Sequence, residues 1–289
     1  MDTGNFTLRK LTPTIGAEVF GIDLTEPPTA QRIGQLRTLL LQHQVIFFRD
    51  QALSHEQHLA LGRGFGSLHT HALANARHRD HPELLIVHAD AKSKYVAGEG
   101  WHSDVTCDAE PPMASMLHLT EVPPEGGDTM FASMYAAYDA LSDAMKSFLE
   151  TLTAIHDGAK PYVGAYGAKP VDIPFARTEH PVVTVHPETG RKVLFVNSGF
   201  TTRIVQLKRS ESDALLQYLY RHIEAPQFMC RFRWEKNSVA FWDNRCTQHQ
   251  AVWDYYPNRR RGYRVTLNGT VPQAANPALK SVPREALAA

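Results

Sequence analysis

Cysteine is scarce in this sequence. Three residues in a chain of 289 are too few, and an odd number, for a disulfide framework. We interpret Cys107, Cys230 and Cys246 as reduced thiols of a protein from a reducing compartment. Cys246 lies near His249, where a thiolate ligand is conceivable. The other two cysteines offer no ligand spacing around it, so a buried thiol is the simpler interpretation.

Long hydrophobic runs and an excess of one charge are also missing. No apolar run approaches the length needed to cross a bilayer, and residues 1–11 are too mixed for a secretory signal. Thirty basic residues balance thirty acidic ones, so nothing in the composition attracts nucleic acid or an anionic membrane. We therefore expect a cytoplasmic protein without nucleic-acid or membrane partners.

What the chain does have is the length and apolar content for a substantial core, since 43% of its residues are hydrophobic. No internal repeat or low-complexity segment divides it. We predict one domain over residues 1–272. The Pro- and Ala-rich residues 273–289 are predicted to be a C-terminal extension over the surface or over a partner subunit, because we also expect a homo-oligomer.

Short strand-like runs alternate with helical patterns along the chain. Polar residues that precede an apolar helical period predict helices at 29–44 and after Ser54, Ser142 and Ser210. Strands are predicted, among other places, at 45–49, 84–88, 113–119, 182–185, 192–197, 238–242 and 263–267. Many short strands with inserted helices predict a mainly β protein of the jelly-roll type, in which the open barrel mouth suits a metal pocket.

Two irregular segments are candidate lids. Residues 91–100 are polar, contain Gly98 and Gly100, and directly precede the motif described next. Residues 157–177 have no clear period, and we predict a long loop there.

The stretch Trp101-His102-Ser103-Asp104 is the one best suited to metal chemistry. In an extended segment, side chains two residues apart lie on the same face, so His102 and Asp104 fill adjacent positions on an ion. His249 is the best candidate for a third ligand. Two histidines and one carboxylate form the facial triad of non-haem Fe(II) oxygenases. A His-x-Asp pair alone is weak evidence in a chain with fifteen histidines.

A cluster of arginines follows the third candidate ligand: Arg259, Arg260, Arg261 and Arg264. Oxygenases with this triad usually use a dicarboxylate co-substrate, and a guanidinium binds a carboxylate through two parallel hydrogen bonds. The alternative is a solvated, charged turn, which suits Arg259 and Arg261. Arg264 lies in an alternating run, where an inward-pointing charge implies a buried anion.

With these residues in place, the chain resembles the taurine and 2,4-dichlorophenoxyacetate dioxygenase family, and most of all its taurine dioxygenase branch. The likeness runs from about Leu8 to Gly269. It includes the phrases Ile15-Gly16-Ala17-Glu18, Gly126-Gly127-Asp128-Thr129, Val196-Asn197-Ser198-Gly199-Phe200-Thr201-Thr202-Arg203 and Trp242-Asp243-Asn244-Arg245. The resemblance implies the double-stranded β-helix fold and the use of Fe(II), 2-oxoglutarate and O2.

The resemblance also implies roles for the site residues. His102, Asp104 and His249 match the metal ligands, and the presence of Asp104 favours hydroxylation, because related halogenases lack this carboxylate. Thr129 and Arg260 match the positions that hold the distal carboxylate of 2-oxoglutarate; without the resemblance, Thr129 would be read as a turn residue after two glycines. Arg264 matches a second arginine, near the other carboxylate and the anionic group of the primary substrate. Trp242 is expected to be a core aromatic beside the site.

The primary substrate is expected to lie near His71, which matches a histidine that contacts the sulfonate in taurine enzymes. His69, two residues earlier, is interpreted as structural. Phe200 matches an aromatic wall of the pocket, and Tyr162 falls approximately where another wall residue lies.

Two departures from the taurine enzymes bear on the substrate. Those enzymes carry a tyrosine where this chain has Ala74, and polar Asp or Asn residues where it has Ala97-Gly98-Glu99-Gly100. The missing groups help to recognise a small aminosulfonate, and polar walls discriminate strongly between substrates. We expect a roomier pocket that still binds an anion at one end.

The expected function is that of a dioxygenase that hydroxylates an organosulfonate at the carbon next to sulfur. The unstable 1-hydroxysulfonate then collapses to an aldehyde and sulfite, with succinate and CO2 as co-products. The same chemistry on a sulfate ester, a phenoxy acid or another carboxylate is an alternative. A different class is a non-catalytic metal-binding jelly roll that senses a ligand.

Overall fold

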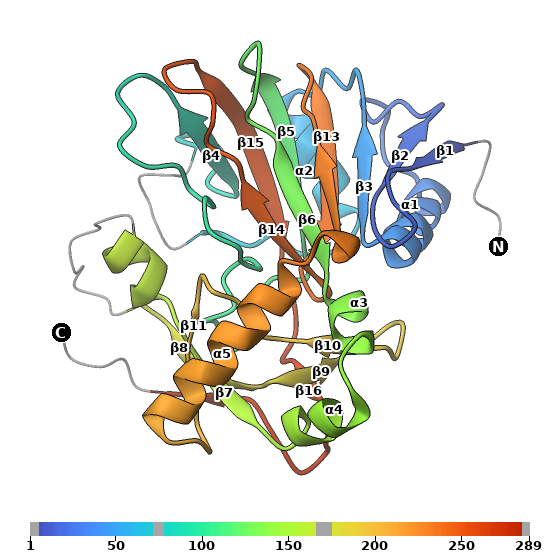
Figure 1. Ribbon diagram of the computed structural model, residues 1–289. Coiled ribbons are helices and arrows are strands. Elements are labelled where there is room, and N and C mark those ends of the chain that lie inside the picture. Colours follow the sequence, from blue (N-terminus) through green and yellow to red (C-terminus); the bar gives the residue numbers. More distant parts are fainter. Residues whose placement is uncertain (1–5, 72–77, 166–174, 285–289) are drawn as a thin grey trace.

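The computed structural model describes residues 6–71, 78–165 and 175–284 (Figure 1). Its strands are β1 Thr7–Lys10, β2 Ala17–Phe20, β3 Val45–Phe48, β4 Leu84–Ala89, β5 Ala114–Glu121, β6 Thr129–Ser133, β7 Thr153–Asp157, β8 Arg177–Pro181, β9 Val183–Val185, β10 Lys192–Leu194, β11 Thr201–Ile204, β12 Met229–Phe232, β13 Ser238–Asp243, β14 Thr247–Ala251, β15 Arg260–Leu267, β16 Gln273–Ala274 and β17 Val282–Pro283. Its helices are α1 Ala30–His43, α2 His55–Arg63, α3 Met134–Asp139, α4 Asp143–Leu149 and α5 Arg209–Ile223, with a π-helical turn at Lys160–Ala165 and a 3-10 turn at Pro226–Phe228.

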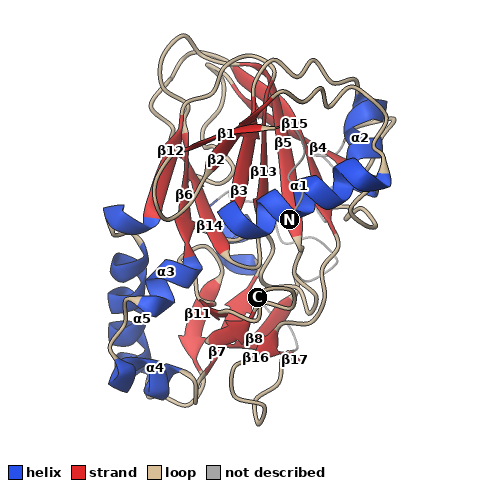
Figure 2. Cartoon of the chain, turned by 90° about the vertical axis from the view of Figure 1, so that its right-hand side faces the viewer, coloured by secondary structure: helices blue, strands red, loops and turns tan. Residues whose placement is uncertain are grey.

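Strands dominate the architecture, as predicted. A seven-stranded sheet has the order β1-β2-β3-β13-β5-β15-β4, and a three-stranded sheet, β12-β6-β14, lies beside it (Figures 1 and 2). Two further sheets, β10-β9-β16 and β11-β7-β8-β17, form the lower part in Figure 1 together with α3, α4 and α5. The two sheets of the upper part carry all the residues that the sequence analysis assigned to the metal and the co-substrate, except those of the loop 101–104.

Strand β3 explains how the large sheet is buried on both faces. Its four residues are all buried, as expected for a central strand with apolar layers above and below. Ile46 and Phe48 pack with α1, whereas Val45 and Phe47 point toward the three-stranded sheet. Phe47 stacks on Phe232 of β12 with ring centroids 4.0 Å apart. The residues between β3 and the three-stranded sheet form the apolar layer that supports the candidate metal site.

The helix starts mostly follow the predicted capping signals. Ser54 and Gln57 form the predicted capping box at the start of α2, and Ser142 caps α4. The prediction for α5 is wrong: the helix begins at Arg209, so Ser210 lies inside its first turn. The Glu211 side chain instead accepts a hydrogen bond from the Lys208 amide at 2.9 Å, so a lysine takes the cap position.

Two predicted irregular regions contain more structure than expected. The predicted loop at residues 157–177 holds the π-helical turn at Lys160–Ala165 and the start of β8, while residues 166–174 lie outside the described part. The expected C-terminal extension adds two short strands, β16 beside β9 and β17 beside β8. Ala74 lies outside the described residues, as does the rest of 72–77.

Across the described ranges, no helix combines the length and the apolar character that crossing a membrane requires.

Candidate functional site

The two histidines of the predicted triad face each other across a β-bridge. The amide of His102 donates to the carbonyl of His249 at 3.1 Å, and the amide of His249 donates back at 2.8 Å. Residues paired in this way project their side chains to the same side. The two imidazole centroids are 4.2 Å apart. Backbone pairing of two distant segments therefore sets the distance between the histidines.

Asp104 completes the triad from the turn that follows His102. Its Oδ1 atom lies 3.8 Å from Nε2 of His102 and 4.0 Å from Nε2 of His249. Its other oxygen, Oδ2, accepts a hydrogen bond from the Ser115 hydroxyl on β5 at 2.8 Å. One carboxylate oxygen is thus anchored, and the other faces both imidazole nitrogens.

Local packing fixes the orientation of His102. Its Nδ1 lies 2.8 Å from the Gly100 carbonyl, so Nδ1 carries the proton and Nε2 presents a lone pair toward Asp104. Gly199 and Gly98 flank the side chain: a Cβ on Gly199 would lie 2.8 Å from the His102 Cβ, and one on Gly98 would lie 3.1 Å from its Cε1. Gly98 also has a φ of +84°, which disfavours other residues there.

The electrostatics of the triad suit a cation. Burial lowers the pKa of His102, and it lowers that of His249 well below its usual range, which keeps both rings neutral. Burial alone would raise the pKa of Asp104, but the positive charge of Arg264, the two neighbouring histidines and the Ser115 hydrogen bond together hold the pKa below its ordinary value. Two neutral imidazoles and one carboxylate, with their ligand atoms within 4.8 Å of one another, are a donor set that fits a divalent metal.

Arg260, at the start of β15, is a buried guanidinium whose hydrogen bonds go to uncharged groups. Its Nε donates to the Gly127 carbonyl at 3.0 Å and its Nη2 donates to the Thr129 hydroxyl at 3.3 Å. Among the described residues, no carboxylate lies within 4.0 Å of its nitrogens. Burial lowers the pKa of Arg260 to about 10. A buried cation in this state calls for an external anion.

Thr129 is arranged to support the same anion. Its hydroxyl oxygen already accepts from Arg260 and from the indole nitrogen of Trp234, at 2.9 Å for the latter. Both acceptor positions are then used, and the hydroxyl proton is left to donate elsewhere. Trp234 was not predicted as a site residue. It follows β12, and nothing in the sequence indicates that its indole lies beside Thr129.

Arg264 lies on the same strand, four residues after Arg260, and points inward as the alternating run predicted. Its Nη1 atom donates to Oδ1 of Asp104 at 2.6 Å. The structure therefore places Arg264 against the triad and Arg260 beside Thr129, in different surroundings. Arg259 is exposed and lies 3.5 Å from Glu121, which agrees with the predicted solvated turn.

The predicted substrate residues gather on the other side of Asp104. The Tyr162 hydroxyl lies 3.2 Å from Nε2 of His71, and the Tyr162 ring lies 6.2 Å from that of Phe200. Phe200 in turn is 6.5 Å from the His102 ring, so the wall reaches the triad. Val105 and Cys107 join Tyr162 and Phe200 in one apolar cluster. Neither was predicted to belong to the wall. His69 lies 3.6 Å from Asp108, which suits its structural interpretation.

Two further polar residues hold the site and were missed by sequence reasoning. The side-chain carbonyl of Asn244 accepts from the Trp242 indole at 2.8 Å, and its amide nitrogen donates to Ser115 at 3.1 Å. Ser115 is the residue that anchors Asp104. Trp242 itself lies 4.8 Å from the His249 ring, in agreement with the prediction of a core aromatic beside the site.

Residues 7–266 match the family whose description is taurine catabolism dioxygenase TauD, TfdA family. A Saccharomyces cerevisiae protein named alpha-ketoglutarate-dependent sulfonate dioxygenase is 35% identical, over 96% of this chain and 69% of its own length. An Acinetobacter baylyi protein named alkylsulfatase is also 35% identical, over 95% of this chain and 88% of its own. The crystal structure of a taurine dioxygenase from Burkholderia xenovorans superimposes with a TM-score of 0.85 at 38% identity and covers 98% of this chain and 97% of that one.

Proposed function

The chain belongs to the taurine catabolism dioxygenase TauD, TfdA family and is a 2-oxoglutarate-dependent dioxygenase, and we propose that it hydroxylates an organosulfonate at the carbon next to sulfur. The 1-hydroxysulfonate formed in this way collapses to an aldehyde and sulfite. The observation that carries the proposal is the pair of arginines on β15: one is buried with no carboxylate within 4.0 Å among the described residues, and the other touches the carboxylate of the triad.

We propose that His102, Asp104 and His249 hold Fe(II). When bound, the iron with O2 and 2-oxoglutarate supplies the oxidising power: one oxygen atom enters the substrate and the other enters succinate, with loss of CO2. The protein contributes orientation and electrostatics. Gly100 keeps the Nε2 lone pair of His102 turned inward, and Ser115 holds Oδ2 of Asp104, so that Oδ1, which also accepts from Arg264, is the oxygen facing the two histidines.

Arg260 and Thr129 are proposed to bind the distal carboxylate of 2-oxoglutarate. The guanidinium and the threonine hydroxyl proton converge on one place, and the Trp234 indole fixes the hydroxyl from behind. A carboxylate there would neutralise a buried charge that the described residues do not pair.

Arg264 is proposed to serve the anionic end of the primary substrate together with His71. The opposite end would meet the apolar wall of Val105, Cys107, Tyr162 and Phe200. A wall of this kind favours an alkyl or aryl group over an ammonium group. The sulfonate and alkyl-sulfate chemistries in the names of the relatives both fit an anion at one end of such a pocket.

A panel of substrates tests the proposal. The purified enzyme with Fe(II), 2-oxoglutarate and O2 should form succinate and sulfite in equal amounts from at least one sulfonate. Release of sulfate from an alkyl sulfate would favour the sulfate-ester alternative. A hydroxylated product without either anion would favour a phenoxy acid or another carboxylate, and no O2 consumption with any substrate would favour a ligand sensor.

Two statements about the whole molecule are also proposals. We propose that residues 1–272 form one catalytic domain with 273–289 as its extension, and that the chain assembles into a homo-oligomer. The pairing of β16 and β17 with β9 and β8 supports an extension that folds back on its own domain. Light scattering of the purified chain measures the oligomeric state.

A further inference from the structure

A second group of three histidines lies on the side of β15 that carries Tyr263, opposite the side chains of Arg260 and Arg264. It consists of His55 at the start of α2 and of His78 and His81 in the turn before β4. Each offers one nitrogen, and the three nitrogens all lie within 4.8 Å of one another. All three side chains are half-buried. The His55 ring packs against Tyr263 of β15, with centroids 4.4 Å apart.

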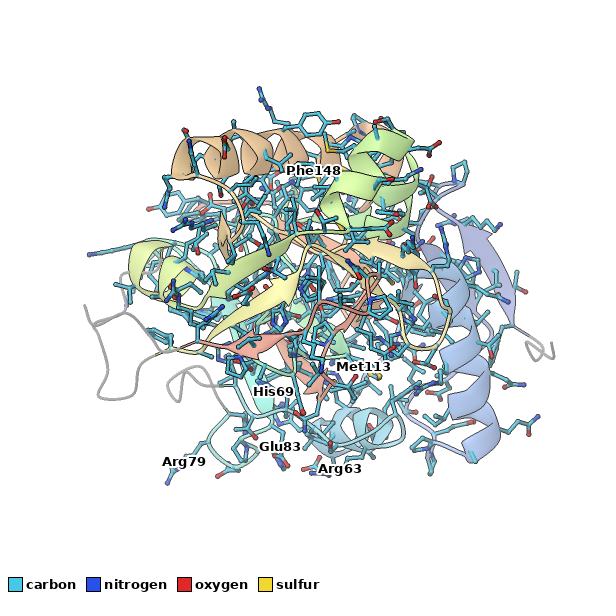
Figure 3. All side chains as sticks on the ribbon, turned by 90° about the horizontal axis from the view of Figure 1, so that it is seen from below. Arg63, His69, Arg79, Glu83, Met113 and Phe148 are labelled. Carbon is cyan, nitrogen blue, oxygen red and sulfur yellow. The ribbon has the colours of Figure 1, made fainter. Side chains whose placement is uncertain are left out.

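Backbone hydrogen bonds hold the two turn histidines in place. The amide of His78 donates to the Leu84 carbonyl at 2.8 Å, and the amide of Leu84 donates to the His81 carbonyl at 2.9 Å. Glu83 of the same turn pairs with Arg63 of α2 at 3.0 Å; Figure 3 labels both residues and Arg79 beside them. The turn is thus closed by its own backbone hydrogen bonds and joined to α2 by an ion pair, which helps to keep the three imidazoles together.

Protonation of His55 is unfavourable in this cluster. Three imidazoles this close repel one another when protonated, and burial followed by the charges of His78 and His81 lowers the pKa of His55. The amide of Asp80 donates to Nδ1 of His78 at 3.2 Å, so a metal bound at this nitrogen would replace that hydrogen bond.

One carboxylate supports the cluster from outside. Glu56 lies 3.4 Å from Nε2 of His81, the arrangement in which a carboxylate orients a metal-binding histidine. Nitrogen ligands of tetrahedral zinc are about 3.3 Å apart, since each Zn–N bond is about 2.0–2.1 Å. Binding would therefore draw the three nitrogens, which lie within 4.8 Å of one another, closer together.

We propose that His55, His78 and His81 form a second metal site that binds a divalent transition-metal cation such as Zn²⁺, with Glu56 orienting His81. The bound ion would link α2 to the turn that precedes β4, on the outer side of the strand that carries Arg260 and Arg264. Its role would be structural, because the site is separate from the triad; water would fill the fourth position that three imidazoles leave open on zinc.

Zinc stoichiometry tests the proposal. The untagged full-length chain, stripped of metal, is titrated with Zn²⁺ against a chromophoric chelator. We expect two ions per chain in the wild type and one in the His102→Ala/His249→Ala variant, in which only the second site remains. The His55→Gln/His81→Gln variant should also bind one ion. His88→Gln, at an exposed histidine outside both clusters, should still bind two.

Two ions in the His55→Gln/His81→Gln variant, or none in the His102→Ala/His249→Ala variant, would overturn the proposal. Should the double glutamine variant fail to fold, Glu56→Gln in the His102→Ala/His249→Ala background replaces it, and its zinc affinity should fall about tenfold. An unchanged affinity there would count equally against the site. Zinc binding is measured without turnover, so its failure is distinguishable from failure of the proposed dioxygenase function.

Discussion

Arg264 donates a 2.6 Å hydrogen bond to Oδ1 of Asp104, the same oxygen that faces the Nε2 atoms of both His102 and His249. The strand that carries the anion-binding arginines is therefore coupled directly to the metal-facing carboxylate. Arg260 lies four residues earlier on the same strand and on the same face. It has no such acidic partner among the described residues. The two arginines consequently should respond differently to substitution.

Arg260→Ala should weaken 2-oxoglutarate specifically. Loss of a charge-assisted carboxylate pair costs on the order of 2–5 kcal/mol, so the KM for 2-oxoglutarate should rise at least tenfold while that for the primary substrate changes little. Arg259→Ala is the matched control, because Arg259 is exposed. Steady-state kinetics with each substrate varied separately measure the effect. Equal increases in both KM values would refute the assignment.

Arg264→Ala should raise both KM values. The guanidinium lies at the triad, where we place one carboxylate of 2-oxoglutarate and the anionic end of the substrate, and each lost charge-assisted contact costs roughly 1.5–3 kcal/mol. The same kinetic measurements apply. An effect confined to 2-oxoglutarate would remove Arg264 from the substrate site.

Taurine should be a poor substrate, and a bulkier sulfonate without an amine should be preferred. The segment Ala97–Gly100 lacks the polar groups that taurine enzymes present, and each missing hydrogen bond to an ammonium group costs roughly 1.5–3 kcal/mol. Val105 and Cys107 extend the apolar wall. Competition between taurine and longer sulfonates, followed by sulfite release, measures the preference. A clear preference for taurine would contradict this expectation.

The folded chain should lose stability in mild acid, partly through His58. Burial lowers the pKa of His58 from 6.5 to about 3, so the unfolded chain binds more protons between these values. Stability contributed by the neutral ring is present above pH 6.5 and is lost as the pH falls below it. The free energy of unfolding should decrease from about pH 7 to about pH 5, and this decrease should be smaller by roughly 2 kcal/mol in His58→Leu than in the wild type.

Urea unfolding at the two pH values measures that difference. His88→Leu, which replaces an exposed histidine, is the control. Identical pH dependence in the wild type and His58→Leu would show that His58 does not titrate with a lowered pKa.

The sequence was sufficient to predict the triad because its signal is local and chemical. His102 and Asp104 alternate in an extended segment, and His249, the best candidate for a third ligand in the sequence, also matches the family pattern. The supporting residues could not be predicted in the same way. Asn244 and Trp234 act through contacts with Ser115 and Thr129, more than a hundred residues away, and Ser115 reaches Asp104 from a neighbouring strand, which no local pattern encodes.

The secondary-structure errors have similar causes. Ser210 has the chemistry of a helix cap, but the Glu211 carboxylate bonds the Lys208 amide and moves the start of α5. The cluster of His55, His78 and His81 was not predicted because its members come from a helix start and a turn that meet only in the folded chain.

The central claim is that His102, Asp104 and His249 hold the iron to which 2-oxoglutarate binds. Its most direct test is the visible spectrum of the anaerobic protein with Fe(II) and 2-oxoglutarate. The account predicts a weak metal-to-ligand charge-transfer band in the wild type and in His69→Ala, and no band and no turnover in His102→Ala. A His102→Ala protein that keeps both the band and full turnover would contradict it.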